Sequence, residues 1–258
     1  MTAADSATID KDRALEVLFE NSRLLITHKP GHTGQAVISF AGIGLGLGGV
    51  PKEEFVKTLA GNDHDQYFVV DKLRSWYNAT ASEIIDVLMT FLLRHDSCIT
   101  LGNSMGGFGA VYFASQLPRC TAALAFGPQY SVNSEFAPKE RRWVNWRSRI
   151  ENWTLPHALS GANPNIRSYL FFGETSDRYQ ARLYKRNILP RMSLLILAQQ
   201  KHRTASYLRD RGVLMPVLEA VRSHIETEAL RSMLQKAGIE TLDEETLLRR
   251  KKIDAVDS

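Results

Sequence analysis

The run Gly102–Gly106, which reads G-x-S-x-G, places a serine where a strand would turn directly into a helix. The apolar segment Cys98–Leu101 precedes it, and small residues open the segment that follows. Such a turn holds the serine in a strained conformation that projects its hydroxyl above the edge of a sheet, and the flanking glycines relieve the crowding. The pattern predicts that Ser104 is a catalytic nucleophile.

A serine hydroxyl is a weak nucleophile by itself, so it needs a general base and an acid that orients the base. His202 follows a predicted strand, Ser193–Ala198, and a short loop. Asp177 follows another, Ser168–Phe172, at a spacing that lets the chain turn back after Gly173. We therefore predict His202 as the base and Asp177 as the orienting acid, with Glu174 as the alternate acid.

Acyl transfer also needs donors for the oxyanion of the tetrahedral intermediate. We predict that these donors are the backbone amide of Met105, after the serine, and that of Ile43, in the loop that follows Phe40.

The glycines from Gly42 to Gly49 could instead cradle a phosphate. This segment, however, lacks the Lys-Ser/Thr ending of a P-loop and a G-x-G-x-x-G spacing that opens a helix.

Strand-like and helix-like segments alternate along most of the chain, which indicates a largely parallel sheet with helices on both faces. The N-terminal segment Arg13–Thr27 suits a hairpin, although Arg13–Glu20 could be helical. The predicted strands are Ala36–Phe40, Tyr67–Val70, Cys98–Leu101, Ala122–Phe126, Ser168–Phe172 and Ser193–Ala198. The predicted helices are Lys52–Leu59, Ser82–Arg94, one from the serine turn to Gln116, Met215–Ala237 and Leu242–Arg250.

The alternation stops between Gly127 and Arg167. We expect a single domain over residues 1–258, with residues 128–167 as a cap or lid insertion and 213–258 as C-terminal helices and tail. A helix over Lys139–Trp153 would place four apolar side chains on one face. That face could pack on the core or wall a substrate pocket, and the same two interpretations apply to Trp76 and Tyr77. The four side chains are those of Trp143, Trp146, Ile150 and Trp153. The residues predicted to wall such a pocket are Trp76, Tyr77, Trp143 and Trp146.

Over roughly residues 13–212 the chain resembles the α/β-hydrolase fold. The resemblance lies in the serine turn, in the chain order Ser104, Asp177, His202, and in the glycine-bearing loop Ala41–Gly44. The resemblance implies a mostly parallel central sheet of about eight strands, helices on both faces, a small helical cap and the three residues at the carboxyl edge. The chain has Ala41-Gly42 where many lipases and esterases have His-Gly. Residues 75–78 and 128–130 also resemble bacterial members of unclear substrate, some of them linked to glycan pathways.

Bulk composition indicates an ordinary globular protein. The net charge is +4, but 32 basic and 28 acidic side chains are mixed along the chain, so no nucleic-acid partner is expected. Cys98 and Cys120 lie in apolar surroundings and are expected to be small buried residues, and no metal or organic cofactor is predicted. The polar segment Met1–Lys11 lacks the apolar run of a secretory signal, and no run suits a membrane span, so a cytoplasmic location is expected.

The predicted function is that of a serine hydrolase that cleaves a carboxylic ester, of a small molecule or linked to a glycan, through an acyl-enzyme on Ser104. Two alternatives stay open. An acyltransferase would use the same residues but pass the acyl group to an alcohol, and a non-catalytic scaffold of this fold would use it for binding. The sequence does not assign an oligomeric state.

Overall fold

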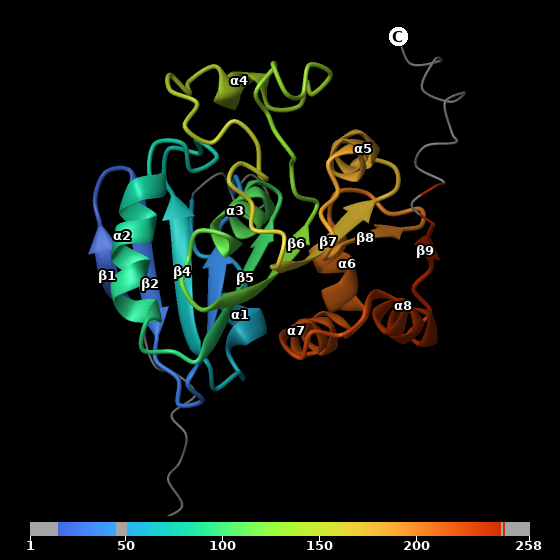
Figure 1. Cartoon of the computed structure of the whole chain (residues 1–258), viewed down its shortest axis with the longest axis horizontal. Coiled ribbons are helices and arrows are strands. Elements are labelled where there is room, and N and C mark those ends of the chain that lie inside the picture. The colour runs from blue at the N-terminus through green and yellow to red at the C-terminus, as the bar shows by residue number, and fades with distance from the viewer. Residues whose placement is uncertain (1–14, 45–50, 244, 246–258) are drawn as a thin grey trace, which may run out of the picture.

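A central sheet of nine strands runs through the molecule in the order β1-β2-β4-β3-β5-β6-β7-β8-β9 (Figure 1). The computed structural model describes residues 15–44, 51–243 and 245. From β4 to β8 every neighbouring pair is parallel, whereas β1, β2 and β9 pair antiparallel at the two edges. The strands are β1 (Glu16–Glu20), β2 (Leu24–Lys29), β3 (Gln35–Phe40), β4 (Asp65–Asp71), β5 (Ser97–Asn103), β6 (Cys120–Phe126), β7 (Arg167–Gly173), β8 (Met192–Leu197) and β9 (Thr241–Leu242).

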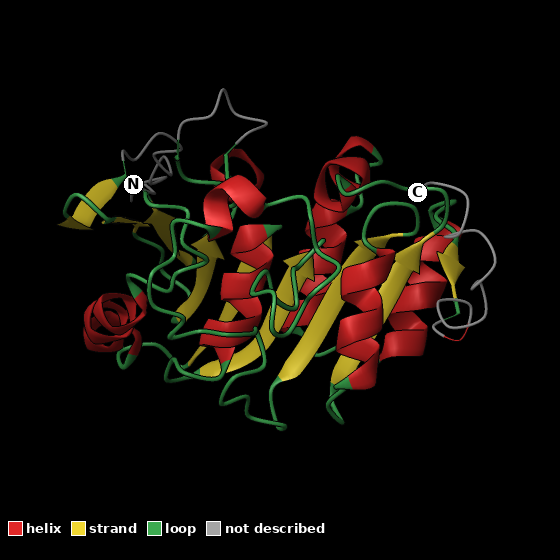
Figure 2. Ribbon diagram, turned by 90° about the horizontal axis from the view of Figure 1, so that it is seen from above, coloured by secondary structure: helices red, strands yellow, loops and turns green. Residues whose placement is uncertain are grey.

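Helices cover both faces of the sheet (Figure 2). On one face α2, α3 and α5 pack with residues of the 128–167 segment in one apolar cluster, and on the other α1, α6, α7 and α8 pack in a second. The helices are α1 (Val56–Leu59), α2 (Ala81–Leu92), α3 (Met105–Ala114), α4 (Val144–Arg147), α5 (Arg178–Arg186), α6 (Thr204–Asp210), α7 (Leu214–Arg222) and α8 (Thr227–Lys236).

The distribution of apolar and small residues explains how the central sheet packs against its helices. The middle strands are apolar on both faces because both faces are covered, as parallel sheets require. In α2, Ile84, Leu88 and Leu92 recur at four-residue intervals and are buried against the sheet. In α3 all residues except Tyr112 are buried, and its small side chains let it lie close to β3 and β5.

The six predicted strands from Ala36 to Ala198 are confirmed as the cores of β3 to β8, and so are the helices α2 and α3. In the N-terminal segment the hairpin is confirmed and the helix is wrong for the residues described, because β1 pairs antiparallel with β2. Together, the strand order and the two covered faces confirm a mostly parallel α/β sheet.

The predicted helix Lys52–Leu59 is too long, because α1 covers only Val56–Leu59. Side-chain contacts hold the residues before it in a non-helical path. The Thr27 hydroxyl donates to the Glu53 carboxylate, and the Ser39 hydroxyl donates to the Glu54 carbonyl. Phe55 then adopts a left-handed conformation, with φ of 66°, at the start of the helix.

The predicted helix Met215–Ala237 is two helices, α7 and α8, separated by a turn in which His224 has φ of 54°. Periodicity alone missed this break because the turn carries neither glycine nor proline. The start of the predicted helix Leu242–Arg250 is also wrong, since Leu242 pairs with Ile196 as part of β9. Most of the rest of that prediction lies outside the described residues.

The helix considered over Lys139–Trp153 does not form except for the four residues of α4 (Val144–Arg147), which lie above the carboxyl ends of the strands (Figure 1). The reason lies at Glu140. Its carboxylate accepts from the backbone and side chain of Arg142, and its carbonyl accepts from Arg147 Nη1 at 2.7 Å. These contacts hold the chain in turns. The division of the chain at residues 128–167 and 213–258 stays a prediction.

Cys98 and Cys120 are confirmed as buried free thiols on the neighbouring strands β5 and β6. A hydrogen bond between the two thiols and burial raise the pKa of Cys98 well above its usual range. Within the described ranges, no helix is long and apolar enough to cross a membrane.

Candidate active site

Four loops leave the carboxyl edge of the sheet side by side. In each, the first residue after the strand donates its amide to the neighbouring strand: Ala41 to Val69, Ser104 to Phe126, Gly127 to Phe171 and Glu174 to Leu197, at 2.7–3.1 Å. The carboxyl ends of parallel strands meet at one edge, where α/β proteins place their sites. The predicted residues of the first, second and fourth loops are thereby brought to one place.

Ser104 lies in the sharp turn between β5 and α3, with φ of 57° and ψ of −119°. Its side chain stands at the edge of the sheet and only 5% of the residue is exposed. The turn is tight because α3 passes very close to β3: a Cβ at Gly106 would overlap the carbonyl oxygen of Phe40. The strained backbone predicted from G-x-S-x-G is therefore present at this position.

The structure brings the three predicted triad residues together. His202 Nε2 lies 2.9 Å from Ser104 Oγ, and His202 Nδ1 lies 2.6 Å from Asp177 Oδ1. The loops that carry the acid and the histidine are tied to each other, since the amide and hydroxyl of Thr175 both donate to the Gln200 carbonyl. The imidazole thus bridges the serine hydroxyl and a carboxylate.

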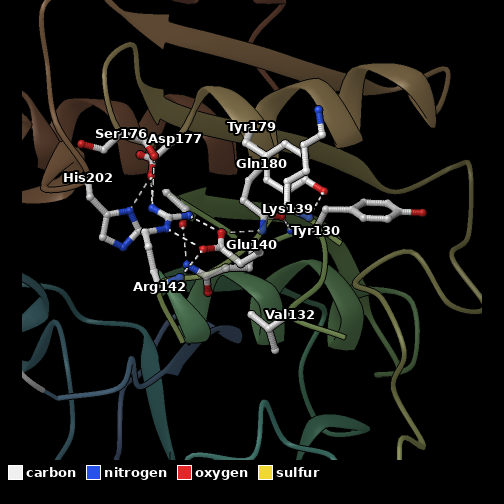
Figure 3. A network of polar contacts seen from close by, with 12 residues as sticks. Tyr130, Val132, Lys139, Glu140, Arg142, Ser176, Asp177, Tyr179, Gln180 and His202 are labelled. Carbon is white, nitrogen blue, oxygen red and sulfur yellow. Dashed lines mark hydrogen bonds and ion pairs between the residues drawn. The ribbon is translucent and has the colours of Figure 1, made fainter. Parts of the chain in front are cut away.

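Asp177 is 1% exposed and is held as an anion by donors on both of its oxygens. Oδ2 accepts from the Gly173 amide at 3.0 Å, while Oδ1, which faces His202, also accepts from Arg142 Nη1 at 3.3 Å (Figure 3). Burial alone would raise the pKa of Asp177, but His202, the Gly173 amide and the Arg142 charge hold it below its ordinary value. The carboxylate stays ionised beside the imidazole.

Arg142 belongs to the 128–167 segment and joins it to α5 as well as to the acid. Its guanidinium contacts both oxygens of the buried Glu140 at 2.7 and 2.9 Å, and Glu140 also accepts from Gln180 Nε2 at 2.9 Å (Figure 3). Burial would raise the pKa of Glu140, but these donors hold it below the usual value. One network of ion pairs and hydrogen bonds therefore joins the 128–167 segment, α5 and Asp177.

Glu174, the alternate acid, lies in the same loop as Asp177 but is engaged elsewhere. Its Oε2 accepts from the Gln199 amide at 2.9 Å, and its Oε1 pairs with Arg178 at 3.3 Å. These contacts join the loop after β7 to the loop after β8. The carboxylate next to His202 is that of Asp177.

The loop of the predicted oxyanion donor Ile43 packs against the serine turn, because a Cβ at Gly42 would lie 2.9 Å from the Asn103 carbonyl. The Tyr77 hydroxyl donates to the Ala41 carbonyl at 2.6 Å and Arg74 Nε to the Ile43 carbonyl at 2.7 Å. Burial raises the pKa of Glu54, which accepts from the Gly42 amide, to about 7. Met105 directly follows Ser104 as the first residue of α3. The use of the Ile43 and Met105 amides stays a prediction.

A second loop, residues 72–78, supports this one and is organised by the buried carboxylate of Asp71. That carboxylate accepts from the amides of Leu73, Ser75 and Tyr77 and from the Ser75 hydroxyl, at 2.7–3.0 Å. Burial raises the pKa of Asp71, although these donors lower it. The loop needs such an anchor because Arg74, Trp76 and Tyr77 all have positive φ.

The four aromatic residues proposed as pocket walls divide into two pairs. Trp76 and Tyr77 are buried, with 1% and 0% exposed. Trp143 and Trp146 are only half-buried. The ring of Trp143 lies 6.4 Å from that of His202, and Trp146 lies between the guanidinium groups of Arg74 and Arg149 at 4.6 and 4.8 Å. A role in contacting substrate stays a prediction for all four.

Three residues that sequence reasoning did not select lie at the site: Gln129, Arg142 and Asp71. Gln129 Nε2 lies 3.2 Å from Ser104 Oγ. Two features of the sequence could have indicated Gln129: it lies in the loop that follows β6, and it belongs to the segment 128–130 that carried the narrower resemblance. Arg142 and Asp71 had no such signal, because their partners are distant in the sequence.

Gly127 closes the site behind the imidazole and gives a testable prediction. It has φ of 53°, and a Cβ there would lie 2.8 Å from the His202 ring and 3.3 Å from Asp177 Oδ2. Gly127→Ala should displace the imidazole and slow reaction at Ser104 by about 100-fold, the cost of a misplacement near 1 Å. The measurement is the second-order rate of labelling by a fluorophosphonate.

Gly212→Ala is the matched control, because Gly212 also has positive φ, 69°, but apart from its chain neighbours the described residues place no atom within 4 Å of the added Cβ. Both variants should lose about 1 kcal/mol of stability through backbone strain. Equal labelling rates for the two variants would contradict the prediction.

Within the described part of the chain, no group of three or more His, Cys, Asp or Glu side chains could hold a metal ion. No protein-family model matches the sequence, and no curated protein matches it. Comparisons by sequence therefore add nothing to the geometry above.

Comparisons with solved structures do find similar folds. An esterase of Pyrococcus furiosus superimposes with a TM-score of 0.55 at 12% identity, over 81% of this chain and 90% of that one. Esterase 2 of Thermogutta terrifontis, phosphonylated by sarin, gives 0.52 at 15% identity over 79% and 92%. The capsule O-acetyltransferase of Neisseria meningitidis serogroup A gives 0.52 at 14% identity over 77% and 93%.

With the strand order and the serine turn, these similarities identify the architecture: the chain has the α/β-hydrolase fold. The expected sheet of about eight strands has nine in the described residues.

Proposed function

We propose that this protein is a serine hydrolase that cleaves a carboxylic ester through an acyl-enzyme on Ser104. The observation that carries the proposal is the chain of contacts from Ser104 Oγ to His202 at 2.9 Å and from His202 to Asp177 at 2.6 Å, in a strained turn at the sheet edge. Such an arrangement is recognised by geometry and roles. The esterases of similar fold support ester cleavage as the reaction class.

In the first step, Ser104 Oγ attacks the ester carbonyl carbon while its proton passes to His202 Nε2. The amides of Met105 and Ile43 hold the oxyanion. When the tetrahedral intermediate collapses, the bond to the alcohol oxygen breaks and Nε2 returns the proton to that oxygen. Water then attacks the acyl-enzyme by the reverse proton path, which releases the carboxylic acid and restores the serine. Asp177 keeps the imidazole in the tautomer that presents the Nε2 lone pair to the serine.

Acyl transfer is the second candidate, because the fold also matches that of a capsule O-acetyltransferase. In that reaction a sugar hydroxyl, or another alcohol, would take the place of water in the second step. One assay distinguishes the two candidates. An activated acetate ester is supplied with and without acceptor alcohols; free acetate indicates hydrolysis, and an acetylated alcohol indicates acyl transfer.

Labelling with a fluorophosphonate tests the proposed nucleophile. Attack of Ser104 Oγ on phosphorus would expel fluoride and leave a stable covalent adduct. We expect the wild-type protein to be labelled and Ser104→Ala to remain unlabelled, as detected by intact mass. A folded wild-type protein that resists the probe would contradict the proposal and favour a non-catalytic scaffold.

A further inference from the structure

Gln129 is fully buried, and its side-chain amide faces the serine hydroxyl. Nε2 lies 3.2 Å from Ser104 Oγ and 3.4 Å from the Gly127 carbonyl, while Oε1 accepts from the Trp76 indole at 3.1 Å. The backbone is also held, because the Tyr184 hydroxyl donates to the Gln129 carbonyl at 3.1 Å. Every polar atom of this amide has a partner.

These partners leave one orientation for the amide. An indole N–H can only donate and a backbone carbonyl can only accept. If the amide were turned over, its NH₂ group would face the Trp76 N–H and its oxygen would face the Gly127 carbonyl. Both contacts would then be repulsive, and Gln129 is fully buried, so the low local dielectric would make them costly. The N–H of Gln129 must therefore point at Ser104 Oγ.

The orientation of the amide fixes the direction of the serine proton. Since Oγ accepts from Gln129, its single proton is left to donate to His202 Nε2. The imidazole is set from the other side, because the Asp177 carboxylate can only accept and so requires the proton on Nδ1. The donations therefore run one way, from Trp76 through Gln129, Ser104 and His202 to Asp177.

We propose that Gln129 is a further catalytic residue, which directs the Ser104 proton to His202 and stabilises negative charge on Oγ, and that Trp76 is the positioning residue that fixes its amide. This inference rests on the proposed function. The bond from Gln129 strengthens whenever Oγ carries developing charge. That happens during attack on the ester, and again when Oγ is expelled from the second tetrahedral intermediate.

The test compares rates of fluorophosphonate labelling for Gln129→Met, Trp76→Phe and the double variant. Methionine keeps the volume and removes both functions of the amide, so Gln129→Met should react about 10- to 100-fold more slowly, the equivalent of one hydrogen bond to a charged group. Trp76→Phe should show a smaller loss. The double variant should be no slower than Gln129→Met, because Trp76 acts only through Gln129.

A pH profile distinguishes this role from a packing role. In both single variants a serine hydroxyl released to rotate should move the acidic limb of the pH profile of labelling as well as lower the rate. Asp177 and Arg142, the charged groups beside the imidazole, are unchanged in these variants. A packing defect would lower the rate without moving the limb.

Gln116→Met is the matched control. Among the described residues the Gln116 side-chain amide donates only to the carbonyl of Gly161, at 3.3 Å, so this variant should react like wild type. Wild-type labelling rates in Gln129→Met or in Trp76→Phe would overturn the inference while leaving the proposed function intact. Trp76→Phe decides alone if Gln129→Met does not fold. A wild-type protein that is not labelled at all would overturn both.

Discussion

Asp177→Asn should lower the rate of ester hydrolysis by about 10⁴-fold, the size of effect that the same change has in serine proteases. The surroundings of this residue explain why the loss should be so large. The Gly173 amide donates to Oδ2, so an asparagine oxygen that stays there turns its NH₂ group toward His202 and also removes the acceptor of Arg142 Nη1. The imidazole would then take the tautomer with its proton on Nε2, which cannot accept the serine proton. Hydrolysis of an activated aryl acetate measures the effect.

Glu174→Gln is the control for this prediction. Glutamine keeps an oxygen for the Gln199 amide and loses the ion pair with Arg178, so activity should stay close to wild type. The opposite result, with Glu174→Gln inactive and Asp177→Asn active, would reassign the acid to Glu174.

Gly106→Ala should destabilise the fold by about 3 kcal/mol or more, the upper range for overpacking a core. The added Cβ would overlap the carbonyl of Phe40, which is fully buried as the last residue of β3 in the middle of the sheet. No flexible side chain can yield there. The helix-forming preference of alanine would return only about 1 kcal/mol. The midpoint of urea unfolding measures the loss.

Gly61→Ala provides the comparison, because apart from its chain neighbours no described residue has an atom within 4 Å of the Cβ that it adds. Its unfolding midpoint should match that of wild type. If Gly106→Ala unfolded at the same midpoint, the close approach of α3 to β3 would be contradicted.

Local sequence patterns were enough to predict most of the central strands and the position of Ser104. Apolar runs between turn residues gave β3 to β8, and the run G-x-S-x-G gave the turn at Ser104, because these signals lie within a few neighbouring residues. His202 and Asp177 could be selected because each follows a predicted strand, and parallel strands bring their carboxyl ends together. In the structure His202 lies within hydrogen-bond distance of both Ser104 and Asp177, although the roles of these residues stay a proposal.

Contacts between distant segments account for what could not be predicted. Lys139–Trp153 has helical spacing, but Glu140 is drawn into bonds with Gln180 and Arg147 that hold the chain in turns. Trp76 was open to a pocket-wall interpretation, whereas its indole N–H contacts Gln129, 53 positions later. Propensity within a window carries no information on such partners.

Asp71 supports the site through a loop, although it contacts none of the reacting atoms itself. Its carboxylate holds the loop from which Tyr77 reaches the Ala41 carbonyl, Arg74 the Ile43 carbonyl and Trp76 the Gln129 amide. A substitution at this single position would loosen both the loop of Ile43 and the side chain that faces the serine. An assay would register a chemical defect, although the altered residue touches none of the groups that react.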